Sequence, residues 1–238
     1  MDSLNNILVL DIETVSGSTS FDDLSPNLQL LWGKKAAFLK NDQNLQPAEL
    51  YFDRAAIYAE FGKIIVIALG FFHQTEEGWS LRVKSFEDHE EKKLLSEFSD
   101  FIGSKFDPEK LTLCAHNGKE FDFPYLCRRM LVNEISIPKA LDFAGKKPWE
   151  IQHMDTMEMW KFGDRKSFTS LDLLTEIFGI DSSKDEMDGS QVNTVYYREG
   201  GLEKIADYCR KDVIATAQLY LRLASLKPIP SPRIVIVE

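Results

Sequence analysis

Cysteine is scarce in this sequence, and neither a disulfide framework nor a zinc site is indicated. The three cysteines, Cys114, Cys127 and Cys209, are odd in number, widely spaced and without a CxxC pair. Long apolar runs are missing too, since no stretch approaches the roughly 20 residues that cross a bilayer. The N-terminus lacks the basic start and long apolar stretch of a signal peptide. A reducing cytoplasm is therefore the expected location, with no membrane contact.

Basic residues are also fewer than acidic ones. The 238 residues include 38 Asp or Glu and 28 Lys or Arg, which gives a formal net charge of -10. A protein that coats nucleic acid passively is normally basic, so this balance argues against such a role. It does not exclude an enzyme that holds cations in an acidic pocket. Apolar residues make up 44% of the chain, which argues against disorder and supplies a core.

Apolar runs and turn signals predict an α/β fold. A continuous apolar run at 7–10 is typical of a strand buried on both faces. Strands at 63–72 and 79–86, separated by a turn signal at 75–78, predict a hairpin. Further strands are expected at 111–115, 151–154 and 234–237, and helices at 28–39, 47–58, 88–102, 123–132, 170–178 and within 201–226. This order predicts a mixed central sheet flanked by helices, in one domain over 1–226 with an insertion at about 16–62 and a C-terminal tail at 227–238.

The first candidate site follows the first predicted strand, at Asp11-Ile12-Glu13-Thr14. Residues two apart in a strand point to the same face, so Asp11 and Glu13 are expected side by side at the end of this strand. Neighbouring carboxylates repel each other, and a divalent cation neutralises them. The alternative is that one acid ends the strand while the other faces water. Taken alone, this pair favours the alternative.

Two later stretches carry the other candidate acids. Asp122 stands before a predicted helix with Pro124 in its first turn, in a loop that follows a strand. It is expected either to cap the helix or to serve a ligand site, because open α/β sheets bind ligands at such loops. On the last long helix, Tyr208 and Asp212 are four residues apart and share one face. A tyrosine half-buried against the core is the more common interpretation of that pair alone.

In chain order, the candidate residues form three motifs: Asp11-x-Glu13, Asn117-xxx-Phe121-Asp122 and Tyr208-xxx-Asp212. These motifs resemble the three exonuclease motifs of the DEDD superfamily, in its tyrosine-bearing branch. The sequence is similar in particular to stand-alone bacterial exonucleases related to the proofreading domain of family B DNA polymerases. The resemblance covers about residues 7–225. It implies an RNase H-like fold and metal-dependent 3′→5′ exonuclease activity on single-stranded nucleic acid, with DNA favoured over RNA.

The resemblance also implies a two-metal-ion mechanism with Mg²⁺ or Mn²⁺. In it, Asp11 bridges two divalent ions. Glu13 and Asp212 complete the first metal site, and Asp122 supports the second. Carboxylate oxygens suit these hard cations, and the lack of a Cys/His cluster disfavours zinc.

Three further roles follow from the same resemblance. Tyr208 is expected to orient the attacking water and not to accept its proton, because an unperturbed tyrosine has a pKa of about 10. Asn117 and Phe121 are expected to contact the terminal nucleotide at the 3′ end of the strand. The products would be nucleoside 5′-monophosphates and a strand shortened at its 3′ end.

Three alternatives remain beside this interpretation. Ribonuclease D-like enzymes carry the same constellation and degrade RNA, and the motifs do not distinguish the substrates because the sugar is recognised at its 2′ position. A catalytically silent nucleic-acid-binding module is disfavoured, since all five acidic and phenolic positions are filled. A metal-stabilised structural domain would lose stability without metal and would have no nuclease activity. If the protein proofreads, it must work in trans with a polymerase or repair partner.

Other polar and aromatic residues receive structural interpretations. His116 is expected to be a satisfied hydrogen-bonding group, and Asp155 either supports the site from behind or stabilises a local turn. Cys209 is expected to pack inward. Core packing is favoured over base stacking for Trp32 and Trp149. The basic pairs at 34–35, 128–129, 146–147, 165–166 and 210–211 are interpreted mainly as solvated surface.

Overall fold

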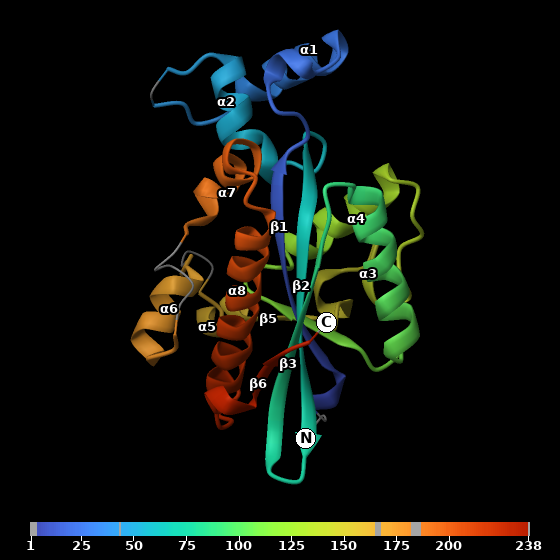
Figure 1. Ribbon diagram of the computed structural model, residues 1–238, viewed down its shortest axis with the longest axis vertical. Helices are drawn as coiled ribbons and strands as arrows, with labels where there is room; N and C mark the ends of the chain where they lie inside the picture. Colours follow the sequence, from blue (N-terminus) through green and yellow to red (C-terminus); the bar gives the residue numbers. More distant parts are fainter. Residues whose placement is uncertain (1–3, 43, 165–167, 182–186, 238) are drawn as a thin grey trace.

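A six-stranded mixed sheet forms the centre of the computed structural model, which describes residues 4–42, 44–164, 168–181 and 187–237 (Figure 1). The strand order is β5-β4-β1-β2-β3-β6. The strands are β1 Ile7–Ser16, β2 Gly62–Thr75, β3 Gly78–Glu87, β4 Thr112–Ala115, β5 Met154–Asp155 and β6 Ile234–Ile236. β2 is antiparallel to β1 and β3, whereas the other neighbouring pairs are parallel. The predicted α/β class with a mixed sheet is confirmed.

Helices cover both faces of this sheet. They are α1 Pro26–Ala36, α2 Pro47–Arg54, α3 Glu91–Lys105, α4 Asp122–Val132, α5 Thr156–Lys161, α6 Leu171–Phe178, α7 Val192–Thr194 and α8 Leu202–Leu223. Figure 1 shows α3 and α4 on one side of the sheet and α8, accompanied by α5 and α6, on the other. None of the described helices is long and apolar enough to cross a membrane.

The alternation of side chains along β1 separates two apolar cores. Leu8, Leu10 and Ile12 pack with residues of α3 and α4, whereas Ile7 and Val9 pack with residues of α8. All five are buried, because a sheet covered on both faces needs apolar side chains on both. Odd-numbered positions of β1 therefore face α8.

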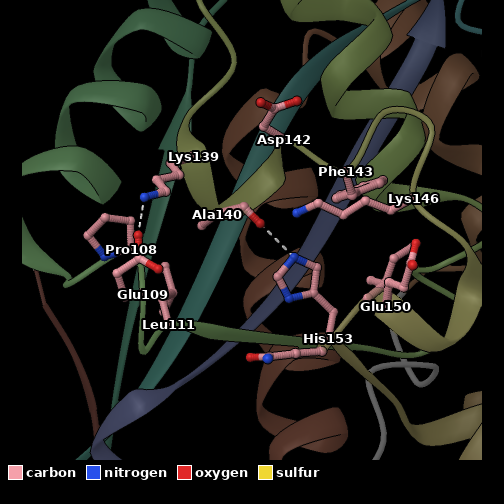
Figure 2. Close-up of a pocket in the computed structure, with 12 residues that line it drawn as sticks. Pro108, Glu109, Leu111, Lys139, Ala140, Asp142, Phe143, Lys146, Glu150 and His153 are labelled. Carbon is pink, nitrogen blue, oxygen red and sulfur yellow. Dashed lines mark hydrogen bonds and ion pairs between the residues drawn. The ribbon is translucent and has the colours of Figure 1, made fainter.

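Two strands differ from the prediction. β1 continues to Ser16, because its last residues pair with β2 after a register shift between Glu13 and Thr14. The first acidic pair consequently lies inside the strand, and its predicted position at the strand end is wrong. β5 contains only residues 154–155. The residues before it line a hollow of about 320 Å³, where His153 donates from Nε2 to the Ala140 carbonyl (Figure 2).

The insertion has a small apolar cluster of its own. Trp32, Leu50 and Tyr51 are buried at its centre, and the Trp32 indole donates to the Pro47 carbonyl at 2.7 Å. Core packing of Trp32 is confirmed, whereas Trp149 is 77% exposed, so its predicted core packing is wrong. In Figure 1 α1 and α2 lie beyond the carboxyl end of β1. The predicted terminal strand is confirmed as β6, and the domain boundary at 226–227 stays a prediction.

Candidate active site

Asp11 and Glu13 project from the face of β1 that packs against α8. Their partners in β2 are Ala68 and Val66, and Glu13 is only 9% exposed. Helix α8 adds Cys209, whose Sγ lies 3.2 Å from Oδ2 of Asp11. Ligand atoms of Asp11, Glu13 and Cys209 all lie within 4.8 Å of one another. This spacing is close enough for the group to hold a metal ion.

Asp122 reaches the same part of β1 from the neighbouring loop. Strand β4 ends at Ala115 while β1 continues, and Oδ1 of Asp122 accepts a hydrogen bond from the Ile12 backbone N–H at 3.2 Å. Helix α4 begins at Asp122 and is preceded by Phe121, which makes no side-chain cap. The expected N-cap role of Asp122 is therefore wrong. A Cβ on Gly118 would lie 2.3 Å from Ala115 Cβ, so this close turn requires glycine.

Asp155 fixes the loop that carries Asp122. Its carboxylate accepts hydrogen bonds from the backbone N–H groups of Asn117 at 3.0 Å and Lys119 at 3.1 Å, and also from Met157 in the first turn of α5. Asn117 has a φ of 62°, and the hydrogen bond from its backbone N–H to Asp155 helps to hold this left-handed conformation. Asp155 thus caps α5 and also holds the loop that leads to Asp122, so the two alternative roles coexist.

His116 at the start of this loop is satisfied by hydrogen bonds, as predicted. Its Nδ1 lies 2.8 Å from the Thr156 hydroxyl and its Nε2 lies 3.0 Å from the Thr169 carbonyl oxygen. Burial lowers the pKa of His116. Both ring nitrogens are therefore engaged, and they connect the end of β4 to Thr156 and Thr169.

Tyr208 and Asp212 complete the group from successive turns of α8. The Tyr208 hydroxyl donates a hydrogen bond to the Asp212 carboxylate. Burial raises the pKa of Tyr208, and the negative charges of Asp212 and Glu13 raise it further, so the phenol stays protonated. The 3₁₀ turn Gly189–Gln191 lies beside it, since a Cβ on Gly189 would be 3.8 Å from the hydroxyl oxygen.

The carboxylates act strongly on one another. Burial raises the pKa values of Asp11 and Glu13, and repulsion from Asp122 and Asp212 raises both further. Burial raises the pKa of Asp122 to about 7. Within the described part of the chain, no lysine or arginine forms an ion pair with Asp11, Glu13 or Asp122. Negative charge concentrated in this way is stabilised by a divalent cation.

The donor set fits a hard cation. Its oxygens come from carboxylates, the ligands that Mg²⁺ and Mn²⁺ prefer. Cys209 is buried as predicted, and burial raises the pKa of its thiol, so the sulfur stays protonated and donates to Asp11. This contact could not be predicted from the sequence, because helical spacing indicates only that Cys209 points inward.

The predicted nucleotide contacts and basic pairs have mixed outcomes. Phe121 is half-buried against Tyr125, with ring centroids 5.3 Å apart, and its contact with a nucleotide stays a prediction, as does that of Asn117. Arg129 is not solvated surface, because it forms a buried ion pair with Glu91. Sequence reasoning missed this pair, for which no local pattern exists. The pair at 165–166 lies outside the described residues.

Comparison with known families now identifies the chain. Residues 57–229 match a family described as a predicted 3′-5′ exonuclease related to the exonuclease domain of PolB. The chain belongs to this family. The matched range includes Asp122, Tyr208 and Asp212, whereas Asp11 and Glu13 precede it. The comparison with curated proteins finds no matching relative.

Among solved structures, this chain resembles the family B DNA polymerase from the hyperthermophilic archaeon Pyrobaculum calidifontis. The two superpose with a TM-score of 0.55 at 16% sequence identity, over 93% of this chain. The chain spans 26% of the polymerase's length. Together with the family match, this likeness confirms the predicted RNase H-like fold and the resemblance to exonucleases of the PolB type.

Proposed function

We propose that this protein is a metal-dependent 3′→5′ exonuclease that hydrolyses single-stranded nucleic acid, DNA in preference to RNA, and releases nucleoside 5′-monophosphates. Membership of the PolB-related family supports the reaction class. The observation that carries the proposal is the cluster of carboxylates around β1, whose pKa values are raised by burial and by their mutual repulsion. Such a cluster is poised for divalent cations and, through them, for a phosphate.

Four acids hold the cations in this proposal. Asp11 would contribute to both of two Mg²⁺ or Mn²⁺ sites, Glu13 and Asp212 would complete the first site, and Asp122 would support the second. When bound, the ions stabilise the entering and leaving oxygens of the phosphodiester and lower the pKa of water. The hydrogen bond from the Ile12 N–H fixes the Asp122 carboxylate beside the first motif before any ion binds.

The remaining residues orient the reactants. Tyr208 stays protonated and positions the attacking water by hydrogen bonding. The water gives up a proton to solvent as its oxygen bonds to phosphorus, and the 3′ oxygen of the preceding nucleotide leaves and takes up a proton from solvent. Asn117 and Phe121 hold the terminal nucleotide, supported by Asp155 and Tyr125 respectively. We place the enzyme in the reducing cytoplasm, where its free cysteines persist as thiols, with a polymerase or repair complex as partner in trans.

Digestion of matched single-stranded DNA and RNA oligonucleotides tests this function. The substrates carry a 5′ label and are incubated with Mg²⁺, Mn²⁺ or EDTA. The expected result is a metal-dependent ladder that shortens from the 3′ end, faster for DNA, with nucleoside 5′-monophosphates released. A faster RNA ladder would favour the ribonuclease D-like alternative. Intact DNA and RNA from folded, metal-loaded protein would overturn the assignment.

A further inference from the structure

A groove of about 400 Å³ separates the insertion from the π-helical segment Val195–Glu199. The described residues that line it are Thr19, Ser20, Phe21, Asp22, Ala48, Glu49, Phe52, Tyr197 and Arg198. The family match begins at residue 57, so the wall built by the insertion lies before it. The groove therefore combines a wall specific to the insertion with a wall that leads directly into α8.

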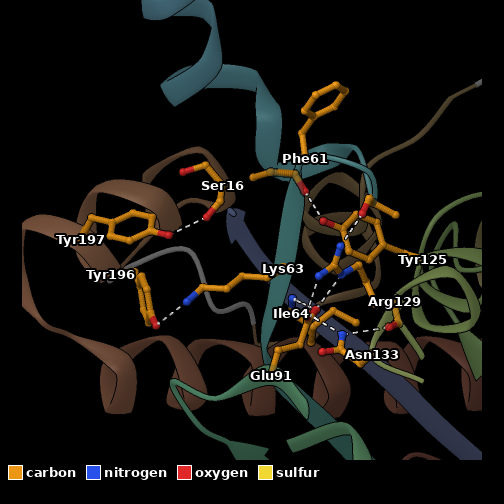
Figure 3. A network of polar contacts seen from close by, with 12 residues as sticks. Ser16, Phe61, Lys63, Ile64, Glu91, Tyr125, Arg129, Asn133, Tyr196 and Tyr197 are labelled. Carbon is orange, nitrogen blue, oxygen red and sulfur yellow. Dashed lines mark hydrogen bonds and ion pairs between the residues drawn. The ribbon is translucent and has the colours of Figure 1, made fainter. Parts of the chain in front are cut away.

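Hydrogen bonds connect both walls to the end of β1, one wall directly and the insertion wall through Asn193. The Tyr197 hydroxyl donates to the Ser16 carbonyl at 2.6 Å (Figure 3). Buried Asn193 accepts from the Ser16 N–H at 2.9 Å and donates to the Phe52 carbonyl at 2.8 Å. Ser16 is three residues beyond Glu13, which corresponds to about 10 Å along a strand. The groove thus has a fixed position close to the carboxylate cluster.

The side chains of the groove match a single strand of nucleic acid. Three aromatic rings, those of Phe21, Phe52 and Tyr197, supply surfaces on which bases stack. Arg198 is the sole cation among the nine described lining residues, and its guanidinium lies 4.7 Å from the centroid of the Phe52 ring. Proteins that bind single strands use aromatic side chains on which bases stack, together with arginine.

The charged residues of the groove are unevenly distributed and determine where phosphates can lie. Asp22 and Glu49 lie on the insertion wall, where they repel phosphate, whereas Arg198 on the opposite wall attracts it. A strand would therefore place a phosphate beside Arg198 and keep its phosphates away from Asp22 and Glu49. Short π-helical segments occur frequently at functional sites, which agrees with this location.

We propose that this groove is a second binding site for the substrate strand. It holds nucleotides on the 5′ side of the scissile bond, with bases on Phe21, Phe52 and Tyr197 and a phosphate beside Arg198. This inference rests on the proposed exonuclease function. It requires that substrates long enough to reach the groove bind more tightly than substrates that occupy the carboxylate cluster alone.

Two variants and two matched controls test the groove. Phe52→Leu removes a ring and Arg198→Gln removes an exposed cation. Phe38→Leu changes a phenylalanine of the same insertion that is 90% exposed outside the groove, and Arg222→Gln changes an exposed arginine at the other end of α8. The substrates are a single-stranded DNA oligonucleotide and thymidine 5′-monophosphate p-nitrophenyl ester, which is too short to enter the groove.

Each groove variant is expected to raise KM for the oligonucleotide about tenfold, with kcat and ester hydrolysis unchanged. Phe52→Tyr keeps an aromatic ring and is expected to retain the wild-type KM. Both controls are also expected to match wild type. Fluorescence anisotropy with labelled oligonucleotide in EDTA should show the same loss of affinity. Equal KM and Kd in folded variants and wild type would overturn the proposal, as would equal losses on ester and oligonucleotide. If wild type hydrolyses neither substrate with metal, the exonuclease function fails, and the anisotropy still decides the groove.

Discussion

Buried carboxylates lie on opposite faces of the sheet, and their surroundings differ in charge. On the α3–α4 face, Glu91 accepts hydrogen bonds from the Ile64 N–H at 2.7 Å, from Asn133 at 2.8 Å and from Arg129 through both of its oxygens (Figure 3). On the α8 face, Asp11 and Glu13 face other acids, and burial together with repulsion raises their pKa values.

The difference agrees with a structural role for Glu91 and with the catalytic role proposed for Asp11 and Glu13. The Glu91 charge is compensated by Arg129, which also donates to the Ala59 carbonyl and ties the insertion to α4. A buried ion pair of this kind is costly to break, because removing one partner leaves the other charge without compensation. In the proposed function, the acids around Asp11 would instead lower their mutual repulsion by binding divalent cations. Four experiments test this contrast, in order of decreasing effect.

Removal of a carboxylate from the α8 face should destroy activity and spare stability. Asp11→Asn and Asp212→Asn are each expected to lower kcat at least about a thousandfold, because a metal ion loses a ligand. The free energy of unfolding should stay constant or rise, since repulsion is relieved. Oligonucleotide digestion and urea unfolding measure the two effects. Full nuclease activity of both variants in Mg²⁺ or Mn²⁺ would contradict the proposed mechanism.

Removal of the cation on the α3–α4 face should have the opposite result. Arg129→Met is expected to lower the free energy of unfolding by about 3–5 kcal/mol, because it leaves Glu91 buried without its partner. The kcat of the folded fraction should change little. Urea unfolding measures the loss, and Glu91→Leu combined with Arg129→Met should recover part of it. Unchanged stability of the single variant would show that the pair does not hold the fold.

The pH dependence of stability should reveal the repelling acids in the metal-free protein. The pKa of Asp122 is about 7 when folded and about 4 in an unfolded chain, so the folded state binds more protons between these pH values. Stability in EDTA should therefore fall as pH rises from about 4 to 7, by on the order of 3 kcal/mol.

Thermal unfolding in EDTA and in Mn²⁺, at both ends of this range, measures the effect. Stabilisation by Mn²⁺ should be larger at the higher pH, where the carboxylates are ionised. Asp122→Asn is the matched control and should flatten the slope. A metal-free protein whose stability rises across this range, with the same slope in Asp122→Asn, would contradict the raised pKa of Asp122.

The smallest effect is expected for the phenol. Tyr208→Phe should lower kcat about tenfold by releasing the attacking water from its hydrogen bond, with KM and Mn²⁺ affinity unchanged. Steady-state kinetics and electron paramagnetic resonance of bound Mn²⁺ measure these quantities. A pH–rate profile that lost its basic ionisation in the variant would instead make Tyr208 the proton acceptor.

Much of the site was predictable because its spacings are local. The two-residue spacing of Asp11 and Glu13 places both on one face of any strand, and the four-residue spacing of Tyr208 and Asp212 does the same on a helix. The apolar run before Asp11 predicted a buried strand, which the structure confirms. The three motifs in order predicted the family.

By itself, then, the sequence determined the fold class, the family and the residues of the candidate site, since periodicity and motif order act over short stretches of chain. Only the tertiary structure decided how distant segments meet. It set the length of β1 through pairing across a register shift, placed Asp122 on the Ile12 N–H, and paired Glu91 with Arg129. It also brought Arg198 over the Phe52 ring in the groove that both side chains line. These contacts depend on the packing of whole elements, which no local spacing specifies.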